Sequence, residues 1–160
     1  MSEIAEQCEA AGFVPAAIVH CSGSAGTQAG LTLGTQLALP TTEVVGIDID
    51  AEPDRVRADV LKYGRGAAAL VGATFEDNRV EVVAGMAGPA YGVPHQATIE
   101  AIRLAGRTEA MILDPVYSGK GLAGLIALIR DGRWRRDDNV VFVRTGGEPA
   151  LFAYQGSMNV

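Results

Sequence analysis

The sequence is poor in the residues on which several classes of protein depend. Two cysteines and two histidines in 160 residues support neither a disulfide framework nor a metal site. Acidic residues outnumber basic ones by 19 to 13, which argues against nucleic acid as a partner. No apolar run reaches the roughly 18 residues of a membrane span, and no basic leader segment opens the chain. We therefore expect a soluble, cytoplasmic protein without a membrane partner.

Glycine, in contrast, is abundant. The 20 glycines are about 12% of the chain, against about 7% in an average protein. Many of them fall in four short segments instead of being spread evenly. These segments are residues 23–30 (GSAGTQAG), 88–94 (GPAYGVP), 114–120 (DPVYSGK) and 144–149 (RTGGEP).

Apolar, β-branched runs alternate with helical patterns along the chain. The patterns predict strands at residues 16–20, 43–49, 80–83, 110–113 and 139–144, and helices at 2–11, 27–39, 52–71, 95–107 and 121–129. Short connections between them indicate βαβ units, hence an α/β fold with an open, mostly parallel sheet and helices on both faces. In such sheets ligands bind beyond the carboxyl ends of the strands, where we expect the four glycine-rich segments.

The segment GSAGT lies between a predicted strand and a predicted helix. Small residues there let consecutive backbone N–H groups turn toward an anion, and the helix N-terminus adds partial positive charge. The segment therefore predicts either a phosphate cup or a tight turn without a ligand. Asp48 follows at the end of the next strand; an exposed strand-end acid is favoured there over a ribose-binding one.

Two tyrosines occupy matched settings. Tyr91 and Tyr117 each follow a proline by two places, Pro89 and Pro115, and each precedes small residues. A rigid turn of this kind presents a phenol to a site, and tyrosine is a general acid or base when its pKa is lowered. The alternative is a tyrosine at the edge of the core with its hydroxyl in water.

Other polar or reactive residues are expected to be structural. Lys120 is interpreted as a surface lysine in preference to an anion ligand, and His20 as a strand-end histidine with its hydrogen bonds satisfied. Cys8 and Cys21 are expected in the core. Trp134 is expected to anchor an otherwise solvated loop.

In order and spacing, four motifs together resemble one family. They are GSAGTQAGL at residues 23–31, GPAYGVP at 88–94, EAIRLAGRTEAMILDPVYSGKGLAGLI at 100–126 and TGGEPALFAY at 145–154. The family comprises the pyridoxal-phosphate enzymes related to D-cysteine desulfhydrase and 1-aminocyclopropane-1-carboxylate (ACC) deaminase, which have the tryptophan synthase β-like fold. The resemblance covers essentially the whole chain.

The resemblance implies roles for particular residues. Tyr91 and Tyr117 would lie over the substrate side of the cofactor, and Thr145 would place its hydroxyl at the pyridine nitrogen. A hydroxyl there leaves the ring a weaker electron sink than a carboxylate would, which suits elimination of a good leaving group. The cofactor phosphate would be held by the backbone of Gly23, Ser24, Ala25, Gly26 and Thr27.

The resemblance also separates subtypes. ACC deaminases carry a glutamate directly after the tyrosine of DPVY, whereas this chain has Ser118. The implied substrate is a small amino acid, and the implied reaction converts D-cysteine and water to pyruvate, ammonia and hydrogen sulfide. ACC deaminase and cysteate sulfo-lyase activities remain alternatives.

Members of the family are about twice as long, and their Schiff-base lysine and substrate-binding serine lie in an N-terminal half. The only lysines here, Lys62 and Lys120, match neither position. Residues 1–160 are therefore expected to form a single α/β domain, the C-terminal half of such an enzyme, with apolar surface left exposed. The resemblance implies a homodimer and a separate N-terminal half; the alternative is a non-catalytic module or remnant that binds the cofactor or phosphate.

Overall fold

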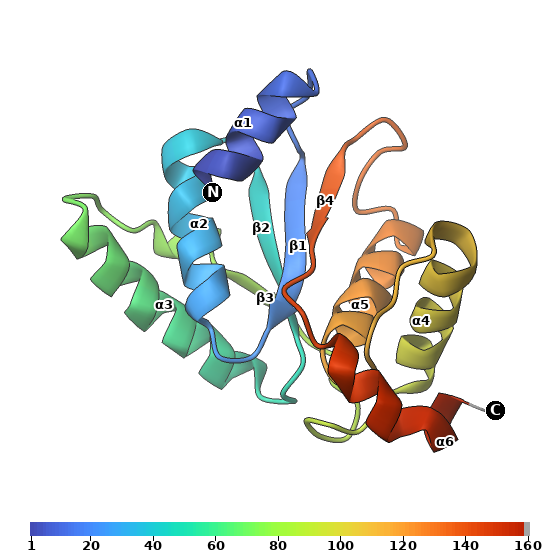
Figure 1. Ribbon diagram of the computed structural model, residues 1–160. Coiled ribbons are helices and arrows are strands. Elements are labelled where there is room, and N and C mark those ends of the chain that lie inside the picture. The colour runs from blue at the N-terminus through green and yellow to red at the C-terminus, as the bar shows by residue number, and fades with distance from the viewer. Residues whose placement is uncertain (159–160) are drawn as a thin grey trace.

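Four parallel strands form the sheet of the computed structural model, which describes residues 1–158 (Figure 1). The strands are β1 (Ala17–Ser22), β2 (Glu43–Asp48), β3 (Glu81–Val83) and β4 (Val140–Val143). Their order across the sheet is β3-β2-β1-β4, and each neighbouring pair is parallel. The predicted α/β class with a parallel sheet is confirmed.

Helices cover both faces of this sheet. They are α1 (Ser2–Ala10), α2 (Gly26–Ala38), α3 (Pro53–Leu70), α4 (Gln96–Glu109), α5 (Ser118–Arg130) and α6 (Gln155–Met158), with 3₁₀ helices at Asp77–Arg79 and Glu148–Tyr154. Figure 1 shows α1, α2 and α3 on one side of the sheet and α5, backed by α4, on the other. The predicted helices agree with the observed ones to within three residues at each end.

The central strands are apolar because both of their faces are covered. Val19 and Ile47 pack against Leu125 of α5, whereas Ile18 packs on the opposite face against Leu31 of α2. All five side chains are buried. Successive residues of one strand thus enter two different cores.

Helix α5 lies unusually close to the sheet because glycines face it. A Cβ at Gly121 would lie 2.3 Å from the sulfur of Cys21, and one at Gly124 would lie 2.7 Å from Ile47. Such separations are too short for real atoms, so only glycine permits this packing. As a result, the start of α5 lies against the carboxyl end of β1.

The strand predicted at residues 110–113 is wrong, since these residues join no ladder of the sheet described here. Ala110 ends α4 in the left-handed conformation, with φ of 52°. The guanidinium of Arg144 donates to the carbonyl of Ile112 at 2.8 Å, which occupies an acceptor that a neighbouring strand would otherwise use. The apolar run reflects burial of Leu113 against α4 and α5, not a β ladder.

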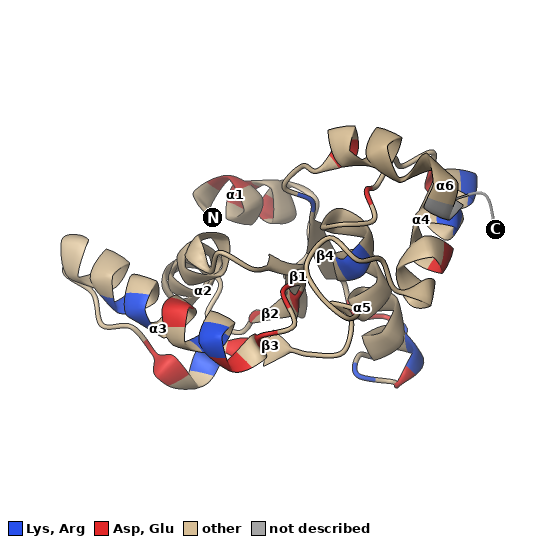
Figure 2. Ribbon diagram, turned by 90° about the horizontal axis from the view of Figure 1, so that it is seen from below, with Lys and Arg blue, Asp and Glu red and all other residues tan. Residues whose placement is uncertain are grey.

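Acidic and basic residues occupy neighbouring positions along α3 and the segments beside it, as Figure 2 shows. Arg55 forms ion pairs with Glu52 at 2.5 Å and with Asp59 at 3.2 Å, and Arg65 pairs with Asp77. Among the described helices, none combines the length and the apolar character that crossing a membrane requires.

Candidate functional site

The sheet reverses its order at β1. From β1 the chain passes through α2 to β2 on one side, whereas β4 pairs with β1 on the other. The loops that follow two strands diverge at such a point and leave a crevice beyond the carboxyl ends, where ligands bind in open α/β sheets. Here the loops are residues 23–25, after β1, and 144–147, after β4.

The loop after β1 presents free backbone amides. Ala25 precedes α2 in the left-handed conformation, with φ of 67°, which is costly for a residue other than glycine and common at ligand sites. The amide of Gly26 donates to the carbonyl of Ser24, and no side chain caps the helix. Among the described residues, the amides of Thr27 and Gln28 have no acceptor. Together with the helix dipole, these donors make residues 23–27, called the anion loop below, suited to an anion.

Two polar side chains at the strand ends beside this loop lack some of their hydrogen-bond partners in the described structure. Ser22 and Asp48 pair in register at the ends of β1 and β2, so their side chains lie on the same face of the sheet, the face covered by α2. The hydroxyl of Ser22 and the Oδ2 atom of Asp48 are buried and have no partner within the described structure. The expectation of an exposed acid at Asp48 is therefore wrong, and burial raises its pKa, although its hydrogen bond from the amide of Asp50 opposes that shift.

Tyr117 and Thr145 meet beyond the carboxyl end of β1. The hydroxyl of Thr145 donates to the phenol oxygen of Tyr117 at 3.2 Å, and that phenol donates to the carbonyl of Cys21 at 3.2 Å. The sulfur of Cys21 in turn donates to the carbonyl of Tyr117 at 3.2 Å. Two of the predicted site residues are thus in contact, and Cys21 links them to the strand that leads directly into the anion loop.

The pKa of Tyr117 is not lowered, although a lowered pKa is the condition under which a tyrosine is a general acid or base. Burial raises the pKa of its phenol, and the hydrogen bond from Thr145 lowers it by less. The nearby phenol of Tyr91 raises it further. Tyr117 is therefore protonated at neutral pH, so its phenol is present as a hydrogen-bond donor and not as a base.

Asp114 holds Tyr117 in place, a role that sequence reasoning missed. Its Oδ2 atom accepts from the amides of Val116 at 2.9 Å and Tyr117 at 2.7 Å. Its Oδ1 atom accepts from the amide of Ser118 at 2.8 Å and from the hydroxyl of the same serine at 2.6 Å. The carboxylate is fully buried, and all four bonds fix the turn that begins α5.

The loop after β4 also packs on this carboxylate. Gly147 has φ of 108°, and a Cβ there would lie 2.3 Å from Oδ1 of Asp114. The signal in the sequence was an aspartate before a helix start, followed by a serine four residues later. That pattern indicates a helix cap, but it does not show that a second loop closes over the cap.

Tyr91 lies at the tip of a tight turn and is 57% exposed. The amide of Val93 donates to the carbonyl of Ala90 at 3.1 Å, and Gly92 has φ of 79°, as the third residue of a type II turn requires. The hydroxyl of Tyr154 donates to the carbonyl of Gly92 at 2.6 Å. Hydrogen bonds therefore hold the backbone of this turn, while the phenol of Tyr91 stays accessible to solvent.

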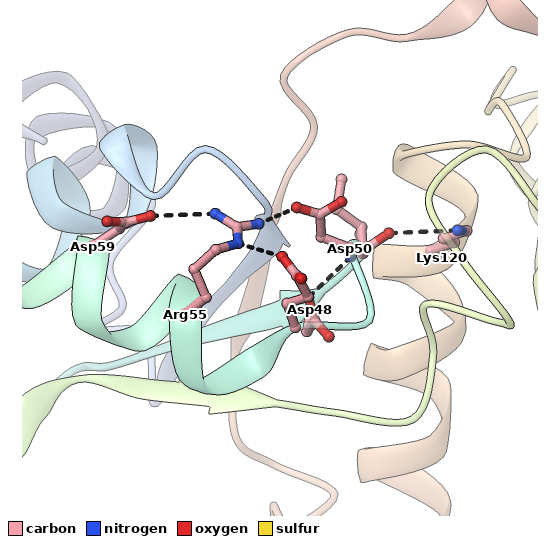
Figure 3. A network of polar contacts seen from close by, with 7 residues as sticks. Asp48, Asp50, Arg55, Asp59 and Lys120 are labelled. Carbon is pink, nitrogen blue, oxygen red and sulfur yellow. Dashed lines mark hydrogen bonds and ion pairs between the residues drawn. The ribbon is translucent and has the colours of Figure 1, made fainter.

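Lys120 is not on the surface, contrary to expectation. It is fully buried, and Figure 3 shows it extending from α5 toward the turn after β2. Its ammonium donates to the carbonyls of Ile49 at 3.4 Å, Ala87, and Ala90 at 3.1 Å. Burial lowers its pKa, and neighbouring carboxylates partly oppose the shift. Lys62, by contrast, lies on α3, with its ammonium 5.8 Å from the ring centre of Tyr63.

The remaining structural expectations are met in part. Cys8 and Cys21 are buried and free, and Trp134 packs against the core beneath α5, as predicted. His20 is buried with only one nitrogen bonded: Nδ1 lies 2.7 Å from the carbonyl of Cys21, while Nε2 has no partner among the described residues. Burial lowers the pKa of His20 to about 4, so it is neutral at pH 7.

Residues 1–146 match the family of pyridoxal-phosphate dependent enzymes. This chain belongs to that family. The resemblance stated from the four motifs is thereby confirmed.

Several curated relatives align with nearly all of the chain. It is 39% identical over 156 residues to the probable ACC deaminase of Schizosaccharomyces pombe, covering 96% of this chain and 46% of that protein. It is 38% identical over 152 residues to the D-cysteine desulfhydrase of Yersinia enterocolitica, covering 95% and 46%. The chain thus spans about half the length of the relatives it matches, and their names divide between two activities.

Solved structures agree with this assignment. A crystal structure of an ACC deaminase homologue superposes with a TM-score of 0.87 at 29% identity, over 98% of this chain and 47% of that one. A crystal structure of a threonine deaminase superposes with a TM-score of 0.54 at 21% identity, over 91% of this chain and 54% of that one, and shares the fold alone. The expected tryptophan synthase β-like fold is confirmed.

The residues present fit one part of the family's cofactor. Unpartnered amides at Thr27 and Gln28 suit its phosphate, and a Cβ at Gly26 would meet no atom within 4 Å, so the space above the loop is open. They do not supply the amine that binds the cofactor covalently. Lys62 lies on α3, with its ammonium over the ring of Tyr63, and the three donors of Lys120 are all engaged.

Proposed function

We propose that this chain forms the phosphate-binding and proton-donating part of a pyridoxal-phosphate dependent lyase of the D-cysteine desulfhydrase type. The overall reaction converts D-cysteine and water to pyruvate, ammonia and hydrogen sulfide. The observation that carries the proposal is the hydroxyl contact between Tyr117 and Thr145, placed where the sheet order reverses and next to an anion loop.

The cofactor phosphate would lie against the loop after β1. The free amides of Thr27 and Gln28 would donate to it, and the first turn of α2 contains no acidic residue to repel it. The contacting residues would be Gly23, Ser24, Ala25, Gly26 and Thr27. When bound, the cofactor supplies the electron sink for chemistry at the α-carbon.

Proton transfer in the proposed reaction falls to the two tyrosines. The phenol of Tyr117, protonated at neutral pH, would donate to the sulfur that leaves, although burial raises its pKa and so weakens it as an acid. Tyr91, which is exposed beside it, would orient the substrate from the other side of the site. Thr145 would turn its hydroxyl from Tyr117 to the pyridine nitrogen, where a neutral group suits a good leaving group.

Ser118 supports the desulfhydrase over an ACC deaminase. Its hydroxyl both donates to Asp114 and accepts from the amide of Asp114 at 3.0 Å, and the side chain is buried. The position that carries a glutamate in ACC deaminases is therefore occupied here by a buried serine that bonds to Asp114 in the turn before α5. Cysteate is a second candidate substrate, because sulfite, like sulfide, leaves without a strong electron sink.

The Schiff-base lysine would come from a separate N-terminal half. Exposed apolar side chains beside β4 support such a partner: Ile112 is 60% exposed and Phe152 85%, and both line one hollow of about 490 Å³. The resemblance implies that the assembled enzyme is a cytoplasmic homodimer. A reducing compartment also suits Cys8 and Cys21, which are buried and free.

The test compares the purified protein alone with the protein coexpressed with the N-terminal half of a related D-cysteine desulfhydrase. Each sample is supplied with pyridoxal phosphate, and the release of sulfide from D-cysteine, ammonia from ACC and sulfite from cysteate is measured. Sulfide release that requires the added half is the expected result. Borohydride reduction and intact mass then show which half carries the cofactor.

Other outcomes separate the alternatives. Sulfide release by this chain alone, with a reduced cofactor adduct on it, contradicts the assignment of the lysine to another half. Cofactor binding without turnover in either sample favours a non-catalytic binding module. Absence of binding and of turnover in both samples refutes the proposed function.

A further inference from the structure

Lys120 connects the two tyrosines of the candidate site. Its backbone amide donates to the carbonyl of Tyr117 at 3.1 Å, in the first turn of α5. Its side chain extends to the turn that carries Tyr91, where it contacts the carbonyls of Ala87 and Ala90. A single residue thus bonds to both segments, which lie far apart in sequence.

The ammonium is fully engaged by this arrangement. A protonated lysine has three N–H donors, and Ile49, Ala87 and Ala90 provide three carbonyl acceptors. An ammonium that lies in the protein interior with every donor used holds its acceptors firmly, because releasing one would leave a buried polar group unpaired. Asp48, Asp50 and Asp114 add favourable charge at longer range.

The backbone carbonyls of the residues on either side of Tyr91 both accept hydrogen bonds. Lys120 holds the carbonyl of the preceding residue, Ala90, and Tyr154 holds that of the following residue, Gly92. The tyrosine side chain is itself exposed and makes none of these contacts. The backbone of the turn therefore sets the direction of the Cα–Cβ bond of Tyr91, and the turn is set in part by Lys120.

We propose that Lys120 is a positioning residue, whose buried ammonium fixes the turn that carries Tyr91 relative to Tyr117 so that both phenols face one substrate. The role of this positioning in catalysis rests on the function proposed above. The contacts of Lys120 do not rest on it, and they are tested without cofactor or substrate.

The first test uses the unmodified protein. With only two lysines, selective ¹⁵N labelling gives two ammonium signals, and Lys62, on α3, is an internal reference. We expect one ammonium to exchange slowly with water and to show scalar coupling to ¹³C-labelled alanine carbonyls, those of Ala87 and Ala90. Two ammonium groups that both exchange rapidly would overturn the proposal, whatever any variant does.

The second test replaces Lys120 by methionine, which keeps most of the length of the side chain and removes its donors. Fluorotyrosine labelling gives four ¹⁹F signals, assigned by single Tyr→Phe variants. Lys120→Met should shift or broaden the Tyr91 signal and leave that of Tyr63, on α3, unchanged. Lys62→Met, the matched control, should leave the Tyr91 signal as it is. An unchanged Tyr91 signal in folded Lys120→Met protein contradicts the proposal.

The third test applies to the enzyme assembled as described under the proposed function. Lys120→Met should lower kcat by about 100-fold, the effect of misplacing a reacting group by about 1 Å, with KM changed by much less. Lys62→Met should keep both constants. A normal kcat in Lys120→Met overturns the proposal, whereas an inactive wild-type enzyme refutes the proposed function and leaves the magnetic resonance results to decide the role of Lys120.

Discussion

The hydroxyl groups of Tyr117 and Thr145 lie 3.2 Å apart, although 28 residues separate them in sequence. Tyr117 precedes α5 and Thr145 follows β4, so the contact joins the turn before α5 to the loop after β4. The phenol also donates to the carbonyl of Cys21, at the end of β1. In the proposed reaction, Tyr117 would exchange this carbonyl for the substrate atom, and Thr145 would turn its hydroxyl away from Tyr117.

Replacing Tyr117 by phenylalanine removes the proposed proton donor. Because the ring remains packed and Asp114 still holds the backbone of the turn, the protein should fold normally. Its kcat for sulfide release should fall by about 100-fold or more, the usual contribution of general acid catalysis. Tyr63→Phe, on α3, is the matched control and should retain full activity. Equal kcat values for the two variants would exclude Tyr117 as the donor.

Gly26 offers a test of the anion loop. A side chain there has open space, and an aspartate at the start of α2 should stabilise the helix by about 0.5 kcal/mol. The same carboxylate should weaken pyridoxal phosphate binding by about tenfold through charge repulsion. Gly26→Asn has the same shape without the charge and should weaken binding much less. Binding is measured by equilibrium dialysis and stability by urea unfolding, and similar affinities in both variants would argue against a phosphate at this loop.

The sequence was sufficient to predict the order of most helices and strands and the loops at their ends. The spacing of apolar residues and the glycines at turns are signals that a short stretch of sequence carries by itself. It failed where a property depends on contacts between distant segments. Lys120 has the sequence neighbours of a surface lysine, and only the turn that holds Ala87 and Ala90 buries it. Asp48 is buried in the same way, beneath α2.

The predicted strand at residues 110–113 failed for a related reason. Leu113 is buried, as the apolar pattern indicated, but a strand also requires a partner ladder. Arg144 donates to the Ile112 carbonyl instead. The contact between Tyr117 and Thr145 was likewise outside the reach of local patterns, since it depends on β4 pairing with β1.

Gly147→Ala should destabilise the protein more than an ordinary glycine substitution. Gly147 and Gly132 both have positive φ, 108° and 75°, so either substitution costs about 1 kcal/mol in backbone strain. Only at Gly147 would the new Cβ also collide with Asp114, whereas at Gly132 it meets no atom within 4 Å. We expect Gly147→Ala to lose at least about 1 kcal/mol more than Gly132→Ala in urea unfolding. Equal losses would mean that the loop after β4 moves freely away from Asp114.

His20 should make the stability of the protein depend on pH. Its pKa falls from 6.5 to about 4 on folding because the ring is buried. Between these values the unfolded chain binds the proton and the native chain does not, so the free energy of unfolding rises with pH across this window. The contribution is present above the unfolded pKa and is lost as pH falls toward about 4, an effect of about 3 kcal/mol.

Two variants isolate this effect. His20→Leu and His20→Gln cannot titrate, and the carbonyl of Cys21 keeps its hydrogen bond from Tyr117 in both. Urea unfolding measured between pH of about 4 and about 7 should therefore give a flatter profile for each variant than for the wild type. Other groups titrate in all three proteins and cancel in the difference. A variant profile as steep as that of the wild type would show that His20 becomes protonated without unfolding, with its free Nε2 reaching water.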